Sequence, residues 1–532
     1  MIVQLAEIAH QKPFNPTIHG YSTTFNMKSS DDLFKLVKSL TKSEKRYFKL
    51  SVSKYSSAEE SNYLTLFDAI DSQQEYDEEK LKKKFSKGKA AKNFPTEKNH
   101  LFKMILKCLR NYSTGQTIGN KLKDLFREAE FLYDKALYDQ SAKILSKAKE
   151  LAIVHGQHFL LLEIYTREAM LLLVTEEEKE LQAHLTTGFQ TAKDMFRKSE
   201  NVYEYLVNHL RSFSISKALG DDVRNPAVLS EFAKILDSPL YKDEKNALSF
   251  EAKHYFYFMH GVYNRIIENW EKNYEFSKKD LELHESNPEI AHENLHQYVS
   301  AISNFSLAQL ELDQFENCLV TLEKLKTLPG LSDSLRLKAN SIYYPRMIAV
   351  HLYSGNFKGI QKHIGEVTEW LEKNKGLFNR SKEINFYWNI AYCNFGMENY
   401  KEAIQWLNRI LNDTSLESVS PDMNCYARIF NLIIHYELGN HDLVEYLVRS
   451  TGRYLNKKSQ AFQQEECLMN FMSKIITLTS KKEIDRAFVT LKNDLGKLDK
   501  DFRSDYFDFQ SWIDSKLTGR PFMDIVQEKV KK

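Results

Sequence analysis

The sequence is poor in glycine and proline, with 18 and 10 residues respectively in a chain of 532. Tight turns and strand hairpins depend on these two residue types, so their scarcity argues against a sheet-rich fold. Both residues also interrupt helices, so a chain that has few of them favours long helices. We therefore predict an all-α fold.

Cysteine is also scarce, and long apolar runs are missing. The five cysteines are far apart and include no C-x-x-C pair, which is typical of a protein in a reducing compartment. No apolar run approaches the roughly 20 residues of a membrane helix. The first residues lack the basic start and apolar core of a secretion signal. We expect a cytoplasmic protein that does not contact membranes.

The common phosphate-binding and nucleophile motifs are absent as well. The sequence contains no G-x-x-x-x-G-K-[ST], no G-x-G-x-x-G and no G-x-S-x-G. We accordingly expect no cofactor, no resident metal and no catalytic residue, and thus a protein that is not an enzyme.

Residues 1–26 lack helical periodicity and contain Pro13 and Pro16, whereas a strong pattern begins just after Met27. We expect this stretch to be a disordered leader or a mis-assigned start. Residues 27–112 then form a basic segment with 19 Lys and Arg against 12 Asp and Glu, although the whole chain has a net charge of only +2. Capping signals and apolar periodicity predict a small domain of short helices here.

A basic bundle of short helices is one way to read DNA. The candidate phosphate contacts are Lys82, Lys83, Lys84, Lys87, Lys89 and Lys92. The alternative is a solvated face on a helical cap, which short charge runs usually form. We favour the solvated face, and nucleic acid remains a possible partner of residues 27–112.

Five segments between residues 113 and 480 share one pattern. Each has a polar turn, then usually an aromatic residue, then a small or apolar residue three positions later. The segments are KALYDQSA (135–142), LDQFENCL (312–319), SGNFKGIQ (354–361), MENYKEAI (397–404) and LGNHDLVE (438–445). Apolar-periodic helices flank each one, which predicts a helical hairpin whose aromatic residue locks the second helix against the first.

The last four segments recur at spacings of 42, 43 and 41 residues. A fixed period of this size indicates a solenoid, because one helix pair cannot bury its apolar face alone. We predict helical repeats over residues 113–480 and a C-terminal helical cap over residues 481–532.

The repeats resemble the tetratricopeptide family. In the best-matching stretch, FYWNIAYCNFGMENYKEAIQWLNRIL (386–411), Ala391 and Ala403 resemble the small residues at the helix crossing, and Tyr400 resembles the turn aromatic. The period is longer than the family's usual 34 residues. The resemblance implies a helical-hairpin superhelix. Through LVKSLTKSEKRYFKL and FLYDKALYDQSAKILSKAKELA the chain also resembles a helical-repeat family of Bacteroidetes with no assigned activity.

One stretch, HENLH at 292–296, matches the H-E-x-x-H pattern of zinc peptidases. Glu316 lies at a spacing that one such class uses for its third ligand. Against a zinc site, Asn287 and Pro288 start a helix that we expect to run to about Leu312. That helix would carry the two histidines roughly 24 Å from the turn. We therefore interpret the motif as structural or as part of a binding groove.

The function that these features favour is a cytoplasmic protein-interaction scaffold, which holds a peptide or protein segment in the concave groove of the repeats. Candidate groove residues, chosen by repeat position, are His292, His296, Asn304, Asn389, Asn394 and Asn431. The first alternative is a transcription regulator whose residues 27–112 bind DNA. The second, which we favour least, is a zinc peptidase.

Overall fold

The computed structural model describes residues 31–53, 58–85, 94–112, 117–175, 178–218, 226–377, 380–413, 421–457, 463–498 and 506–530. Every regular element in these ranges is a helix, which confirms the predicted all-α class. None of those helices combines the length and apolar content that a bilayer crossing requires. The expected leader, residues 1–26, lies outside the described residues. The chain divides into one unit of residues 13–200 and a second that contains residues 201–532.

The first unit starts with short helices that surround their own hydrophobic core, which includes Phe48, Phe67 and Leu101. The capping box predicted at Thr41 is present: the Thr41 N–H donates to Glu44 Oε2 at 2.7 Å, and the Glu44 N–H donates to Thr41 Oγ1 at 3.2 Å. The helices are α1 (Asp32–Ser39), α2 (Lys42–Ser53), α3 (Ala58–Asp71), α4 (Glu78–Lys84) and α6 (Phe94–Tyr112).

The same unit continues with a second helical group that has a separate core. Its helices are α7 (Ile118–Asp134), α8 (Tyr138–Val154), α9 (His158–Val174) and α10 (Glu178–Ala218), and the last of these runs on into the second unit. Helices α7 and α8 form the hairpin predicted from KALYDQSA.

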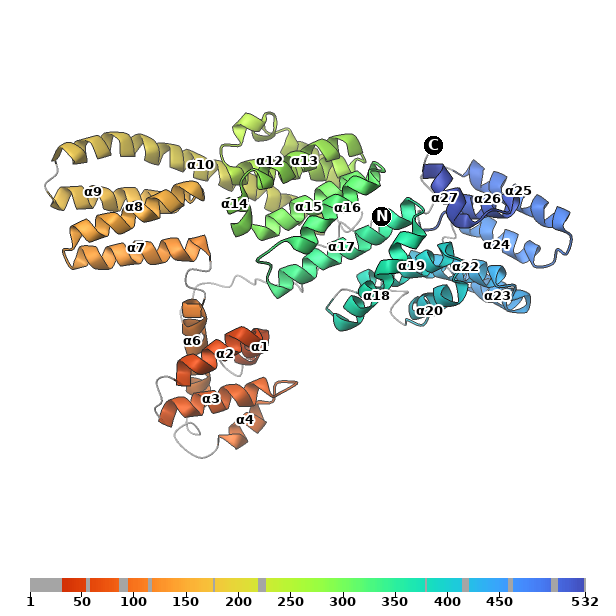
Figure 1. Ribbon diagram of the computed structural model, residues 1–532, viewed down its shortest axis with the longest axis horizontal. Helices are drawn as coiled ribbons and strands as arrows, with labels where there is room; N and C mark the ends of the chain where they lie inside the picture. The colour runs from red at the N-terminus through yellow and green to blue at the C-terminus, as the bar shows by residue number, and fades with distance from the viewer. Residues whose placement is uncertain are drawn as a thin grey trace. The chain divides into compact units, whose positions relative to one another are not determined.

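The second unit is a succession of helix pairs, in which each pair packs against the next through one large core (Figure 1). The pairs are α12 (Phe250–Ile266) with α13 (Trp270–Glu285), α15 (Leu295–Glu311) with α16 (Phe315–Thr327), α17 (Asp333–Tyr353) with α18 (Phe357–Lys373), α19 (Arg380–Gly396) with α20 (Tyr400–Leu411), α22 (Pro421–Glu437) with α23 (His441–Lys457), and α24 (Gln463–Ile475) with α25 (Lys481–Lys497). This arrangement bears out the prediction of stacked helical hairpins.

The turns inside five of these six pairs share one backbone geometry, and α24–α25 is the exception. The residue two positions before the second helix has a positive φ: 57° at Glu268, 55° at Asp313, 67° at Gly355, 61° at Glu398 and 73° at Gly439. In three of the turns the next N–H donates to the carbonyl five residues back at 2.8 Å, which is the Schellman way of ending a helix. The recurring turn therefore explains the recurring sequence pattern.

Small residues mark the point where the two helices of a pair cross. Ala391 and Ala403, which the tetratricopeptide resemblance singled out, are both fully buried. At the equivalent position of another pair, Cys318 Sγ lies 3.1 Å from the Ser306 carbonyl. The crossing is thus close enough for a side chain of the second helix to reach the backbone of the first.

The pair α12–α13 has the same turn, although its sequence was not recognised as a repeat. Trp270 begins the second helix two residues after Glu268, and Asn273 takes the crossing position. The Asn273 amide donates to the Gly261 carbonyl at 2.7 Å. A polar asparagine where other pairs carry Cys, Ile, Ala or Val obscured the pattern.

The helix expected to run through HENLH is broken, so this prediction is wrong. Helix α14 (Pro288–Glu293) ends before Asn294, and α15 begins at Leu295. The Asn294 side chain donates to the Ile290 carbonyl at 3.1 Å, and its own backbone leaves the helical region at φ −113° and ψ 44°. Asparagine commonly competes with helical hydrogen bonding in this way.

After the last pair, α26 (Phe509–Thr518) ends at Gly519 and α27 (Phe522–Val530) follows. Both helices share the large core with the repeats. The Gln527 amide donates to the Gly355 carbonyl at 2.9 Å, so the last helix reaches back to the turn of α17–α18.

Candidate functional site

The two histidines of HENLH are exposed and lie on either side of the helix break at Asn294. The imidazole of His292 lies against the loop before α17, with Nε2 3.2 Å from the position that a Cβ on Gly330 would take. Glu316 lies in the first turn of α16. Within the described residues these three do not form a cluster able to hold a metal.

The four candidate asparagines occupy different environments. Asn304 and Asn389 are partly exposed on α15 and α19. Asn394 is buried, and its amide donates to the Ile390 carbonyl of its own helix at 2.9 Å, so it faces the core rather than a ligand. Asn431 is also buried, and its Oδ1 has no hydrogen-bond partner in the described structure.

Two arginines that the sequence analysis did not single out contact residues in the middle of α15. Arg265, in the last turn of α12, donates from a terminal nitrogen to Asn304 Oδ1 at 3.5 Å. Arg346, on α17, donates to the Ser303 carbonyl and, at 2.8 Å, to Ser306 Oγ. The first helices of three successive pairs therefore bring two guanidinium groups to the middle of α15.

The electrostatics of this arginine pair (Arg265 and Arg346) are unusual for a folded protein. Arg265 is only partly exposed, and no described carboxylate forms an ion pair with it. Its Nε is buried without a hydrogen-bond partner. Burial, together with the nearby Arg346 charge, lowers the pKa of Arg265 to about 10. The guanidinium still carries its charge at neutral pH, so this position holds a cation that no carboxylate of the described residues neutralises.

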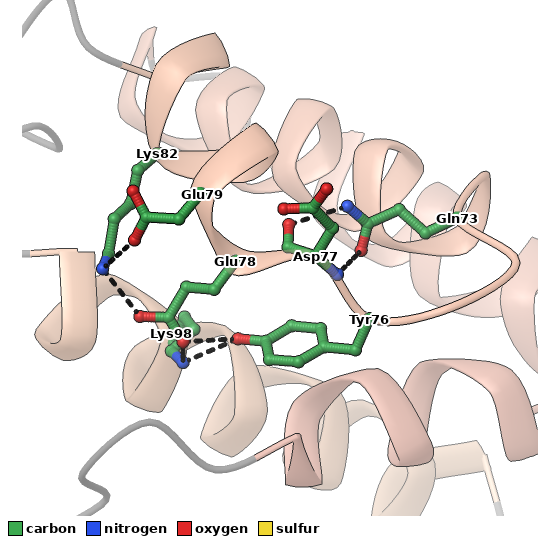
Figure 2. A network of polar contacts seen from close by, with 7 residues as sticks. All are labelled: Gln73, Tyr76, Asp77, Glu78, Glu79, Lys82 and Lys98. Atoms are coloured by element: carbon green, nitrogen blue, oxygen red, sulfur yellow. Dashed lines mark hydrogen bonds and ion pairs between the residues drawn. The ribbon is translucent and has the colours of Figure 1, made fainter.

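The candidate nucleic-acid surface is partly neutralised. Figure 2 shows the Lys82 ammonium between two carboxylates of its own helix, 3.1 Å from Glu78 and 3.0 Å from Glu79. Lys83 and Lys84 are exposed on α4. The other candidates, Lys87, Lys89 and Lys92, lie outside the described residues.

Beneath α4 the same network contains a lysine that is not a surface residue at all. Lys98 of α6 is 3% exposed, and its ammonium lies 2.8 Å from Glu78 Oε2 and 2.9 Å from the Tyr76 hydroxyl (Figure 2). Burial raises the pKa of Glu78, but hydrogen bonds from Lys98, Tyr76 and Lys82 outweigh it and lower the value to about 2. Part of the basic excess of this domain is therefore structural.

No family model matches the chain, and no curated protein matches it either. Among solved structures it is similar to the crystal structure of the P58(IPK) TPR domain. The identity is 10% and the TM-score 0.19, and the match covers 77% of this chain and 100% of that one. So low a TM-score carries no argument, and the tetratricopeptide-like architecture rests on the recurring turns and crossings. The resemblance to a Bacteroidetes family stays a prediction.

Sequence reasoning missed the arginine pair because neither residue stands in a motif. Arg265 lies three residues before the turn residue Glu268, whereas Arg346 lies nine residues before the turn residue Gly355, so a column-by-column comparison of the repeats does not align them. The available signal was weaker: each arginine interrupts an otherwise aromatic and apolar helix. The sequence analysis also missed the buried group formed by His254, Asp280 and His284.

Proposed function

We propose that this chain is a non-enzymatic protein-interaction scaffold of the cytoplasm. Its second unit would bind an acidic segment of a partner protein on the face where α12 and α15 present Arg265 and Asn304, next to the buried Arg346. The observation that carries the proposal is the guanidinium of Arg265, which is partly buried and has no carboxylate partner among the described residues.

An unpaired charge that is partly withdrawn from water costs folding free energy. A carboxylate from a partner would supply the missing charge, and hydrogen bonds to charged groups contribute about 1.5–3 kcal/mol each. Arginine suits this role because its planar group binds carboxylates through two parallel hydrogen bonds. Asn304, whose Oδ1 accepts from Arg265, would offer its amide N–H groups to the same ligand.

DNA binding through residues 27–112 receives less support. One of the described candidate lysines, Lys82, is already paired with two carboxylates, and the charge of Lys98 is used within the core. A transcription regulator is the alternative, and it predicts that material captured by the full chain is lost after nuclease treatment.

The test begins with an unbiased phage-displayed peptide library selected on the full chain. The selected peptides are expected to be enriched in Asp and Glu. Their affinity is then measured by fluorescence polarisation for the wild type, for Arg265→Met and for the control Arg520→Met. Arg520 is an exposed arginine that already has a carboxylate partner, Glu528, at 2.7 Å.

We expect Arg265→Met to weaken binding roughly 10- to 100-fold, the loss of one charge-assisted interaction, whereas Arg520→Met should bind normally. Because Arg265 carries an uncompensated charge, its replacement should leave the melting temperature unchanged or raise it. Peptides without acidic enrichment, or equal affinity of all three proteins, would refute the proposal. A fall in melting temperature would instead indicate that Arg265 serves folding.

A further inference from the structure

Three metal-binding side chains meet inside the helix pair α12–α13. His254 lies in the first half of α12, whereas Asp280 and His284 lie four residues apart on one face of α13. Their exposures are 3%, 1% and 0%. Charged and imidazole side chains are seldom buried so completely without a specific reason.

The donor atoms of these three residues are close together. Asp280 Oδ1 lies 2.8 Å from His254 Nδ1 and 3.8 Å from His284 Nδ1. One nitrogen from each imidazole and one carboxylate oxygen all lie within 4.8 Å of one another, and no other trio of this kind occurs in the described parts of the chain. Zinc–nitrogen and zinc–oxygen bonds are about 2.0–2.2 Å long. The donor atoms would therefore have to move only slightly closer together to bind one zinc ion.

Hydrogen bonding leaves part of the group unsatisfied. Asp280 Oδ2 and His284 Nε2 are buried and have no partner in the described structure. His284 Nδ1 lies 2.8 Å from the Asp280 carbonyl. A backbone carbonyl that holds one imidazole nitrogen leaves the other with a lone pair, as in many metal sites.

The charge balance also calls for a cation. A buried carboxylate is costly unless a positive charge accompanies it. The ion-pairing groups near Asp280 are the two imidazoles, and burial lowers the pKa of His284 despite the opposing effect of Asp280. A bound metal ion would supply the compensating positive charge.

Aromatic rings fix the imidazoles in place. The His284 ring stacks on Tyr298, with centroids 5.7 Å apart, and meets the edge of Phe250 at 5.0 Å. A further imidazole, His209 of α10, contacts Phe258 at 4.9 Å, and the His254 ring contacts the same Phe258 at 6.0 Å. His209 Nδ1 is buried and has no partner in the described structure, but it does not belong to the group whose donor atoms lie within 4.8 Å of one another.

We propose that His254, Asp280 and His284 bind one divalent transition-metal ion, of which zinc fits the two-nitrogen, one-oxygen donor set best. The ion would bind in the core of the first helix pair and fasten α12 to α13, as a structural rather than a catalytic site. This site does not depend on the proposed peptide binding, and it is an alternative to the expectation from the sequence that the chain holds no metal.

The experiment uses the full chain, stripped with a chelator and then titrated with zinc sulfate. Bound zinc is counted by mass spectrometry of the desalted protein, and cobalt substitution reports ligand geometry through its visible absorption. The variants are Asp280→Asn and His284→Gln, with the double variant His292→Gln and His296→Gln as the matched control from the exposed HENLH motif. Far-UV circular dichroism verifies that each variant is folded.

We expect one zinc per chain, a tetrahedral cobalt spectrum and a higher melting temperature with metal. Affinity should fall at least about tenfold in Asp280→Asn and His284→Gln and stay unchanged in the control. Failure of the wild type to bind zinc or cobalt would overturn the proposal even if a variant does not fold. Zinc lost only from the control variant would also overturn it, because the ion would then belong to HENLH.

Discussion

Lys98 is buried in the fold, although lysine is usually a surface residue. In the sequence it is one of many lysines in a basic domain, yet it is buried against Glu78, Tyr76 and the ring of Phe94. A buried ammonium without an anion is far more costly than one with a partner. The burial of Lys98 therefore depends on the carboxylate of Glu78.

We predict that Glu78→Gln destabilises the front helices by about 2–3 kcal/mol, somewhat below the usual cost of breaking a buried pair because Glu78 keeps some contact with water. Hydrogen exchange of the full chain, followed by mass spectrometry, should show faster exchange in α6. The matched control is Glu79→Gln, the neighbouring exposed carboxylate that pairs only with Lys82. Equal exchange in the two variants would contradict the account.

The same pair predicts a pH dependence. The pKa of Glu78 is lowered from 4.5 to about 2 in the folded protein, so its stabilisation is complete above the unfolded value and is lost as the pH falls toward 2. The difference in exchange between the wild type and Glu78→Gln should accordingly shrink between about pH 5 and pH 2.

At the scale of elements, every turn between paired helices ends a helix, and one of these turns also contacts a distant helix. Gly355 and Gly439 both have a positive φ, 67° and 73°, which glycine adopts at little cost. Around Gly439 there is open space, whereas a Cβ on Gly355 would lie 2.9 Å from the backbone nitrogen of Gln527. The turn at Gly439 therefore only ends a helix, whereas the turn at Gly355 also contacts the C-terminal helix α27.

We predict that Gly439→Ala costs about 1 kcal/mol, the strain of a side chain at positive φ, and that Gly355→Ala costs clearly more. Thermal unfolding followed by tryptophan fluorescence suits this comparison, because all five tryptophans lie in the second unit. Hydrogen exchange should show α27 loosened only in Gly355→Ala. Two variants of equal stability would show that the contact with Gln527 contributes nothing.

Elements were largely predictable from the sequence, because their signals are local. Phe315, Phe357 and Tyr400 begin second helices as their spacing predicted, and the capping box at Thr41 is formed. The break at Asn294 was not predictable from apolar periodicity. The Asn294 side chain competes with backbone N–H groups for the Ile290 carbonyl, and this competition leaves no trace in the spacing of apolar residues. The α12–α13 repeat escaped because Asn273 replaces a small apolar residue.

At the scale of the whole molecule, each proposed site is built from residues that are distant in the chain. Arg265 and Arg346 lie on different repeats and meet only because α12, α15 and α17 stack. His254 reaches Asp280 only because α12 and α13 form a hairpin. No spacing rule in one sequence predicts either meeting, since each depends on the register between helices. The candidates chosen from the sequence by repeat position included Asn304, but they also included Asn394, which the fold buries.

The central claim is that the repeats, through Arg265, bind a protein partner. The most direct measurement is capture from native cytosol on the full chain, on Arg265→Met and on Lys83→Gln with Lys84→Gln, each with and without nuclease. The account predicts a protein partner that is lost in Arg265→Met and retained in the lysine variant, whatever the nuclease treatment. Material that survives Arg265→Met but disappears with nuclease or with the lysine variant would contradict it and favour the basic front helices.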